Sequence, residues 1–141
     1  GGESENLKAL ARQYETTNVH FQPFIPREEY PELLKNFDVG LVCLSPKNHT
    51  PVVPGKLLTY MAASLPVLAV LNRESDGNVI VRAADCGLAV PSDDKEAIAE
   101  AIRTMYENRS RLGAWGAQGQ AYVDKNFEKA AVISELEKYL A

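Results

Sequence analysis

Apolar residues along the chain gather in short continuous runs and in helical stripes. Three nearly unbroken apolar runs, at 38–44, 66–71 and 87–90, have the length of strands. Continuous runs are typical of parallel strands that helices cover on both faces. Helical stripes follow at about 55–63 and 78–85. This alternation predicts an α/β fold, a Rossmann-like doubly wound parallel sheet with helices on both faces.

The residues before the first run predict two helices and a further strand. One helix spans about 4–14 and a second about 30–37, each with an apolar stripe that predicts a buried face. Between them, residues 19–22 predict a short strand, with His20 packed inside it. The stripes consist of Leu7, Leu10, Ala11 and Tyr14 in the first helix and of Tyr30, Leu33, Leu34 and Phe37 in the second.

Three more helices are expected after the third run, layered on the sheet. Ser92 or Asp93 would cap the first, because a side-chain oxygen before an acidic first turn satisfies free amides. This capping role is favoured over a metal site for the acidic pair Asp93 and Asp94. The other two helices span about 110–127 and 129–140. Three evenly spaced glycines favour close helix packing: Gly113, Gly116 and Gly119.

The composition is that of one ordinary soluble domain over residues 1–141. Hydrophobic residues make up 45% and charged residues 24% of the chain, which is enough for a continuous core. The net charge of −4 argues against nucleic-acid binding, and no apolar stretch approaches the ~20 residues of a membrane-spanning helix. Cys43 and Cys86 lack metal-type spacing, so we expect both to be reduced, buried residues of a cytoplasmic protein.

Candidate chemistry lies in the turns that leave the carboxyl ends of the strands, where open α/β sheets bind ligands. These turns are 23–27, 45–57 and 72–78. The second is a polar, proline-rich loop that leads into a helix start at Gly55 and Lys56. Free amides, a glycine and a lysine at a helix start suit an anion, above all a diphosphate. The alternative is that the Pro-Gly pair only begins the helix and that the lysine is a solvated cation.

Other nucleotide-binding motifs are absent from the sequence. The P-loop pattern fails because Leu57 follows Lys56 and no glycine precedes Gly55 at the required spacing, and the dinucleotide pattern GxGxxG does not occur. His49 is a candidate for substrate contact, although a lone histidine in a loop is more often ordinary surface. No Ser-His-Asp or Cys-His triad can be argued.

Six segments, in the same order and spacing, resemble a known family. They are NVHFQPFIP at 18–26, DVGL at 38–41, PGKLL at 54–58, YMAASLPV at 60–67, GLAVP at 87–91 and YVDKNF at 122–127. Together they resemble the C-terminal, donor-binding domain of retaining glycosyltransferases with the GT-B fold (glycosyl transferases group 1). The bacterial branch that assembles capsule, exopolysaccharide or O-antigen is the most similar. The resemblance covers essentially the whole chain.

The resemblance implies transfer of a hexosyl group from a nucleotide-diphosphate sugar to an acceptor in polysaccharide biosynthesis. The diphosphate would meet Gly55, Lys56 and Leu57. The nucleobase would lie against a loop made of Phe24, Ile25 and Pro26. Thr59 and His49 are the candidates for contact with the ribose or the sugar. Neither a metal ion nor a cofactor is implied, because donors aimed at the departing diphosphate stabilise its charge.

The chain departs from the family pattern at two places. Many relatives carry two glutamates separated by seven residues, where this chain has Pro51 and Thr59, so the ribose contact is lost or is made by the Thr59 hydroxyl. In addition, the GGE at 1–3 resembles the turn after the second strand, so the domain would lack its first two strands. We therefore expect exposed sheet edges and a strand-exchanged dimer of this fragment.

The acceptor would be bound mainly by an N-terminal domain outside this chain, so we expect the chain alone to be inactive. Its location would be the cytoplasm, or the inner face of the membrane for a lipid-linked acceptor. The alternative function is a non-catalytic α/β module, either a nucleotide-binding regulator or a scaffold. A receiver-type regulator is disfavoured because Asp38 stands at the start of its strand rather than at the end.

Overall fold

The computed structural model describes residues 3–128 and 132–133, which divide into two units, Gly1–Tyr30 and Pro31–Ala141. The helix predicted at 129–140 lies outside the described residues, apart from residues 132–133, which are helical.

The N-terminal unit contains one helix and an irregular segment. Helix α1 (Ser4–Gln13) confirms the prediction for this region, but its apolar stripe is not buried, since Leu7 is 53% and Leu10 46% exposed. The strand predicted at 19–22 is wrong. The segment has no regular structure and pairs with no strand among the described residues, and His20 is exposed rather than packed. A strand needs a hydrogen-bonded neighbour, which an alternating sequence does not itself supply.

Helix α2 (Tyr30–Leu34) is shorter than the predicted 30–37 because Asn36 ends it. The Asn36 side chain donates a hydrogen bond to the Glu32 carbonyl at 3.0 Å. The Asn36 backbone N–H donates to the Leu33 carbonyl, three residues back. An amide side chain that bonds the last carbonyls competes with continuation of the helix. Leu34 is buried as predicted, whereas Phe37 is 49% exposed and the prediction for its side chain is wrong.

Three parallel strands form the sheet in the order β1-β2-β3, namely β1 (Gly40–Cys43), β2 (Val67–Leu71) and β3 (Gly87–Pro91). β2 is buried at every position, whereas β1 alternates between buried and exposed residues. β1 is therefore an edge strand, and none of the described residues pairs with its outer side. This position corrects one prediction: Cys43 is exposed, whereas Cys86 is buried as expected.

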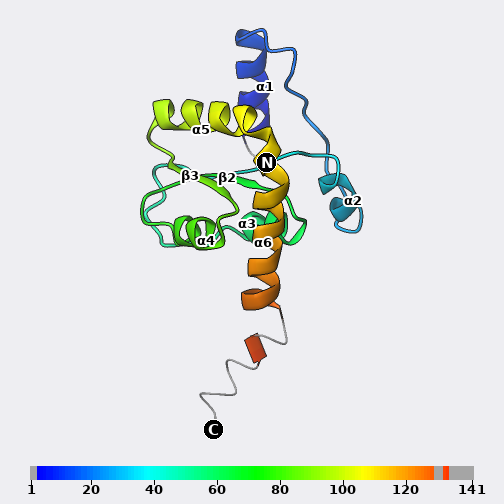
Figure 1. Cartoon of the computed structure of the whole chain (residues 1–141). Coiled ribbons are helices and arrows are strands. Elements are labelled where there is room, and N and C mark those ends of the chain that lie inside the picture. The colour runs from blue at the N-terminus through cyan, green and yellow to red at the C-terminus, as the bar shows by residue number, and fades with distance from the viewer. Residues whose placement is uncertain (1–2, 129–131, 134–141) are drawn as a thin grey trace. The chain divides into compact units, whose positions relative to one another are not determined.

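Helices cover both faces of the sheet (Figure 1). Helices α3 (Gly55–Ala62) and α4 (Gly77–Ala84) share one core with β2, in which Leu57 and Met61 are fully buried. Helix α5 (Lys95–Glu107) packs on the opposite face. The predicted doubly wound α/β sheet with helices on both faces is confirmed.

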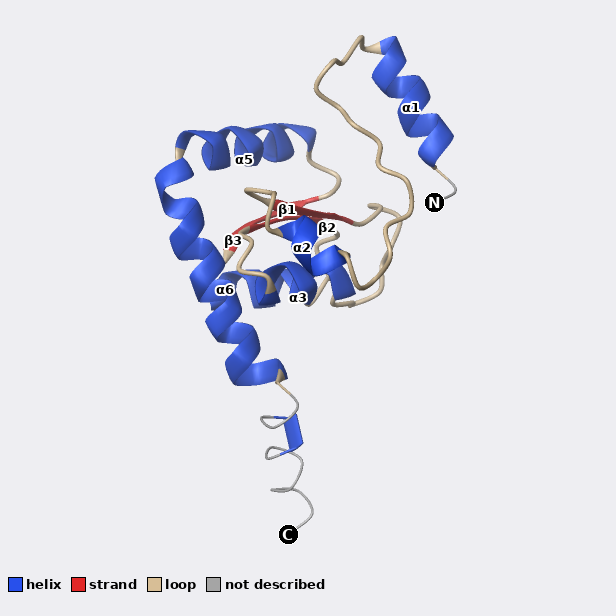
Figure 2. Ribbon diagram, turned by 90° about the vertical axis from the view of Figure 1, so that its right-hand side faces the viewer, coloured by secondary structure: helices blue, strands red, loops and turns tan. Residues whose placement is uncertain are grey.

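The long helix α6 (Leu112–Phe127) follows a short 3-10 turn and runs past the sheet from one helical layer to the other (Figures 1 and 2). Near its start, Trp115 joins the core beneath α5, and near its end Tyr122 packs against the core beneath α3 and α4. The helix therefore ties the two layers together. A 3-10 turn at the helix start, over Arg109–Arg111, refines the boundary predicted at residue 110.

The glycines of α6 permit this close approach. A Cβ added at Gly116 would lie 2.0 Å from the Ser64 carbonyl oxygen, and one at Gly119 would lie 3.0 Å from the Cys86 Cβ. A Cβ at Gly113 would meet nothing within 4 Å. Close helix packing is therefore confirmed for Gly116 and Gly119 and is wrong for Gly113.

Helix α5 is capped by Asp94, so the capping role predicted for the acidic pair Asp93 and Asp94 is confirmed for Asp94, whereas the prediction of Ser92 or Asp93 as the N-cap is wrong. The Asp94 side chain accepts a hydrogen bond from the Ala97 amide at 2.9 Å. The Ser92 backbone N–H donates to the Leu71 carbonyl at 2.8 Å and so continues the hydrogen bonding between β3 and β2. The chain must leave the sheet before it can turn into the helix, which moves the cap one residue further along.

Candidate functional site

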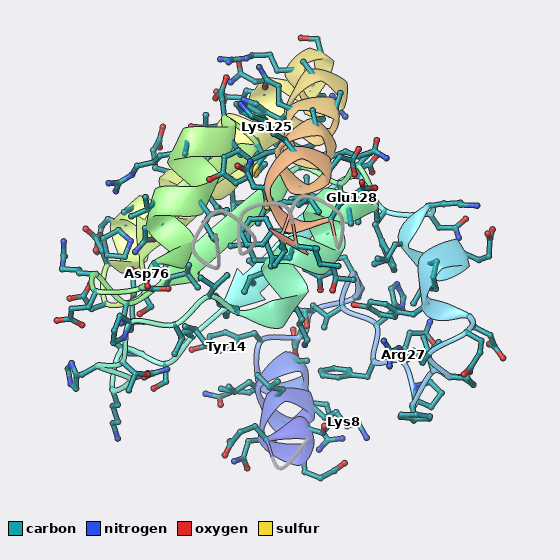
Figure 3. All side chains as sticks on the ribbon, turned by 90° about the horizontal axis from the view of Figure 1, so that it is seen from below. Lys8, Tyr14, Arg27, Asp76, Lys125 and Glu128 are labelled. Carbon is teal, nitrogen blue, oxygen red and sulfur yellow. The ribbon has the colours of Figure 1, made fainter. Side chains whose placement is uncertain are left out.

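The turns that leave β1, β2 and β3 meet at the carboxyl edge of the sheet and are bonded to one another. The Ser75 hydroxyl, in the turn after β2, donates to the Val52 carbonyl in the turn after β1 at 2.6 Å. The Arg73 guanidinium pairs with the Asp93 carboxylate in the turn after β3 at 3.3 Å. Helix α4 begins in the same region, directly after Asp76 (Figure 3). The three turns therefore form one continuous surface.

The start of α3 is open to solvent. No side chain caps this end, because Pro54 occupies the N-cap position. A Cβ at Gly55 would meet no atom within 4 Å, so packing does not require the glycine and a ligand has room to approach. Lys56 is exposed beside it. An uncapped helix start with an adjacent ammonium group has the electrostatic character that an anion needs.

Lys56 also acts on the end of β1. Partial burial raises the pKa of the Cys43 thiol, and the positive charge of Lys56 opposes that rise. The positive charge of Lys56 therefore acts at the carboxyl end of β1, the end at which open α/β sheets bind ligands.

Leu57 and Thr59 are both engaged within α3. The Leu57 side chain is fully buried, and its amide donates to the Pro54 carbonyl at 2.9 Å. The Thr59 hydroxyl donates to the Gly55 carbonyl at 3.0 Å, which leaves its oxygen to accept a hydrogen bond. Their roles at the diphosphate and the ribose remain predictions.

Phe24, Ile25 and Pro26 belong to the N-terminal unit, whereas the start of α3 belongs to the other unit. Within that unit the Phe24 side chain is 91% exposed, Ile25 is half-buried and Pro26 is exposed. An aromatic ring with so much free surface is available for stacking. Their contact with a nucleobase remains a prediction.

A small pocket of about 90 Å³ lies between the turns, and no local sequence pattern indicates it. His49 lines the pocket, and its Nδ1 lies 3.8 Å from the Glu74 carboxylate. Asn72 and Ser92 also line it, and Asn72 is only 5% exposed. The turn at 72–78 was a candidate by its place after a strand, but the burial of Asn72 depends on three turns meeting, which no local pattern reveals.

The fold defines the class of protein, an α/β domain of the Rossmann-like type, a class in which ligands generally bind at the turns after the parallel strands. A sequence model of the family Glycosyl transferases group 1 matches residues 1–122, and the chain therefore belongs to that family and is a glycosyltransferase domain. No curated protein and no solved structure matches the chain.

Two further observations concern the described residues alone. Among them, no three His, Cys, Asp or Glu side chains gather as a metal site would require. In the same residues, every helix is too short or too polar to cross a membrane.

Proposed function

We propose that this chain binds a nucleotide-diphosphate sugar and forms the donor-binding part of a retaining glycosyltransferase with the GT-B fold. The observation that carries the proposal is the open start of α3, with Gly55 and Lys56 at the carboxyl edge of a parallel sheet, in a chain of this family. The diphosphate would rest on the free amides of the first turn, and the lysine ammonium would lie beside it.

The same groups would promote the reaction. As the glycosyl bond breaks, negative charge grows on the departing nucleoside diphosphate, and fixed amides and an ammonium group stabilise it without a metal ion. His49 and Thr59 would contact the sugar or ribose, and Phe24, Ile25 and Pro26 the nucleobase. The acceptor would be bound by another domain, so the chain alone would not transfer the sugar.

The biological setting is part of the proposal. By resemblance, the reaction is hexosyl transfer in bacterial polysaccharide biosynthesis, in the cytoplasm or at the inner face of the membrane. The outer edge of β1, with which none of the described residues pairs, would pair with a second copy in a strand-exchanged dimer, because unpaired strand edges recruit other strands.

Calorimetric titration with UDP-, GDP- and ADP-sugars tests the donor site. We expect one nucleotide class to bind, and Lys56→Ala to weaken it by about tenfold to a hundredfold, the effect of removing one hydrogen bond to a charged group. Lys125→Ala, in the last turn of α6 (Figure 3), is the matched control and should change the Kd by less than about twofold. Equal binding by Lys56→Ala and the unmodified chain would show that the diphosphate lies elsewhere. Absence of binding by every nucleotide sugar would refute the donor role and favour the scaffold alternative.

A further inference from the structure

Two residues that line the pocket at the carboxyl ends of β2 and β3 each carry a buried polar atom that has no hydrogen-bond partner. These atoms are the Asn72 Oδ1 and the Ser92 Oγ. Buried polar groups in proteins are nearly always hydrogen-bonded, so two orphans on residues that line one small pocket require an explanation.

Asn72 is held with its acceptor oxygen free. Its Nδ2 donates to the Glu74 carboxylate at 3.3 Å, and its backbone carbonyl accepts a hydrogen bond from Asn78 Nδ2 at 2.9 Å. The Ser92 backbone is fixed by the bond from its amide to the Leu71 carbonyl, whereas its hydroxyl can still rotate. The pocket therefore presents a fixed acceptor and an adjustable donor.

Two exposed polar contacts also line the pocket. His49 faces Glu74, and Arg73 pairs with Asp93, so both donors and acceptors are present at its rim. An anion would meet two carboxylates, and an apolar group would leave both orphan atoms unsatisfied. A hydroxyl group both donates and accepts, and therefore fits this mixture.

The size of the pocket limits what enters it. Its volume of about 90 Å³ is smaller than the roughly 150 Å³ cavity that holds a benzene ring in another protein. This space takes the hydroxyl-bearing edge of a sugar ring and excludes a whole ring or a nucleobase. The pocket is also linked to the start of α3, because Ser75 bonds Val52 and a Cβ at Gly77 would lie 3.2 Å from Pro54 Cδ.

We propose that this pocket is the subsite that selects the transferred sugar by its ring hydroxyls. One hydroxyl donates to Asn72 Oδ1 and accepts from the Ser92 hydroxyl, and the polar side chains at the rim bond its neighbours. The inference rests on the proposed donor function and deepens it. The pocket favours a neutral hexose over a uronic acid, because the uronate carboxylate would face Glu74 and Asp93.

The binding affinities of two ligands, the nucleotide sugar and the free nucleoside diphosphate, distinguish the role of the pocket from that of the diphosphate site. We expect Ser92→Ala and Asn72→Leu to weaken binding of the nucleotide sugar by about tenfold, and to leave binding of the free nucleoside diphosphate within about twofold. Lys56→Ala should weaken both. Ser110→Ala, an exposed serine in the 3-10 turn, is the control and should weaken neither. Unchanged nucleotide-sugar affinity in both pocket variants would overturn the subsite while leaving the donor function intact.

Free sugars test the pocket without the nucleotide. Glucose, galactose and mannose at high concentration should shift the Asn72 side-chain amide signals in a ¹⁵N–¹H correlation spectrum, glucuronate should shift them less, and Ser92→Ala should reduce the shifts. Such shifts in a chain that binds no nucleotide would show that the pocket binds sugars, but would refute the donor function and with it the pocket's role as a subsite for the transferred sugar. The absence of any shift, together with an absence of nucleotide-sugar binding, would overturn both proposals.

Discussion

Replacement of Gly116 by alanine tests how α6 joins the two layers of the domain. The new Cβ would lie 2.0 Å from the Ser64 carbonyl oxygen, whereas real Cβ contacts are at least about 3 Å. The helix would have to move by about 1 Å against backbone rather than against an adjustable side chain. Ser64 offers little freedom, since its φ is 56° and its hydroxyl donates to the Gln120 side chain at 2.6 Å.

The size of the effect follows from two opposed contributions. Overpacking of this kind costs about 1–3 kcal/mol, and contact with backbone places this site near 3. Alanine recovers about 1 kcal/mol of helix propensity relative to glycine. We therefore expect Gly116→Ala to lower the free energy of unfolding by about 2 kcal/mol. Gly113→Ala lies in the same helix with open space around it, so it should raise that free energy by up to about 1 kcal/mol.

Urea denaturation followed by the fluorescence of Trp115, the single tryptophan of the chain, measures both variants. The two should differ by about 3 kcal/mol although the chemical change is identical. Equal midpoints for the two variants would refute the reasoning, because the contact between α6 and Ser64 would then carry no energetic consequence.

Three further predictions concern the cap of α5, the reactivity of the two cysteines and the pH dependence of stability. Asp94→Ala should cost about 1 kcal/mol of stability in the same urea assay, because it removes the cap of α5, whereas the exposed Asp93→Ala should cost less. Iodoacetamide should label Cys43 and spare Cys86 in the folded chain, as mass spectrometry of the peptides would show; equal labelling would contradict their different burial. Burial raises the pKa of Cys86 to about 11, so the folded state keeps a proton that the unfolded chain loses near pH 9. Stability should therefore fall as pH rises from about 9 to 11, and Cys86→Ala should flatten that slope.

The sheet could be predicted because its signal is local. A strand buried on both faces must be apolar at every position, and β2 (Val67–Leu71) satisfies this without reference to its neighbours. The partner of a strand and its position in the sheet depend on residues far away in the sequence, so no local pattern predicts them. The segment at 19–22 has the alternation of a strand but no partner among the described residues, and Cys43 is exposed because it lies on the uncovered face of β1.

The candidate site likewise has residues that the sequence indicates and residues that it does not. Gly55 and Lys56 could be proposed from sequence because a helix start after a buried strand has a fixed direction and a fixed set of free amides. Asn72 could not, because its burial and its unpaired oxygen arise only where turns after three different strands meet. A polar residue after a strand is ordinarily expected to be solvated.

Contacts between the turn after β2 and the turn after β1 connect the pocket around Asn72 to the start of α3. Gly77 opens α4, and a Cβ there would lie 2.7 Å from Leu71 Cδ1 and 3.2 Å from Pro54 Cδ. The start of α4 is thus packed against both the end of β2 and the residue that precedes α3. Because Ser75 also bonds the Val52 carbonyl at 2.6 Å, the turn that holds Asn72 cannot shift without moving the approach to Lys56. A donor bound at the start of α3 would therefore meet the pocket at a fixed separation, which is the condition for one site to hold the diphosphate while the other selects the sugar.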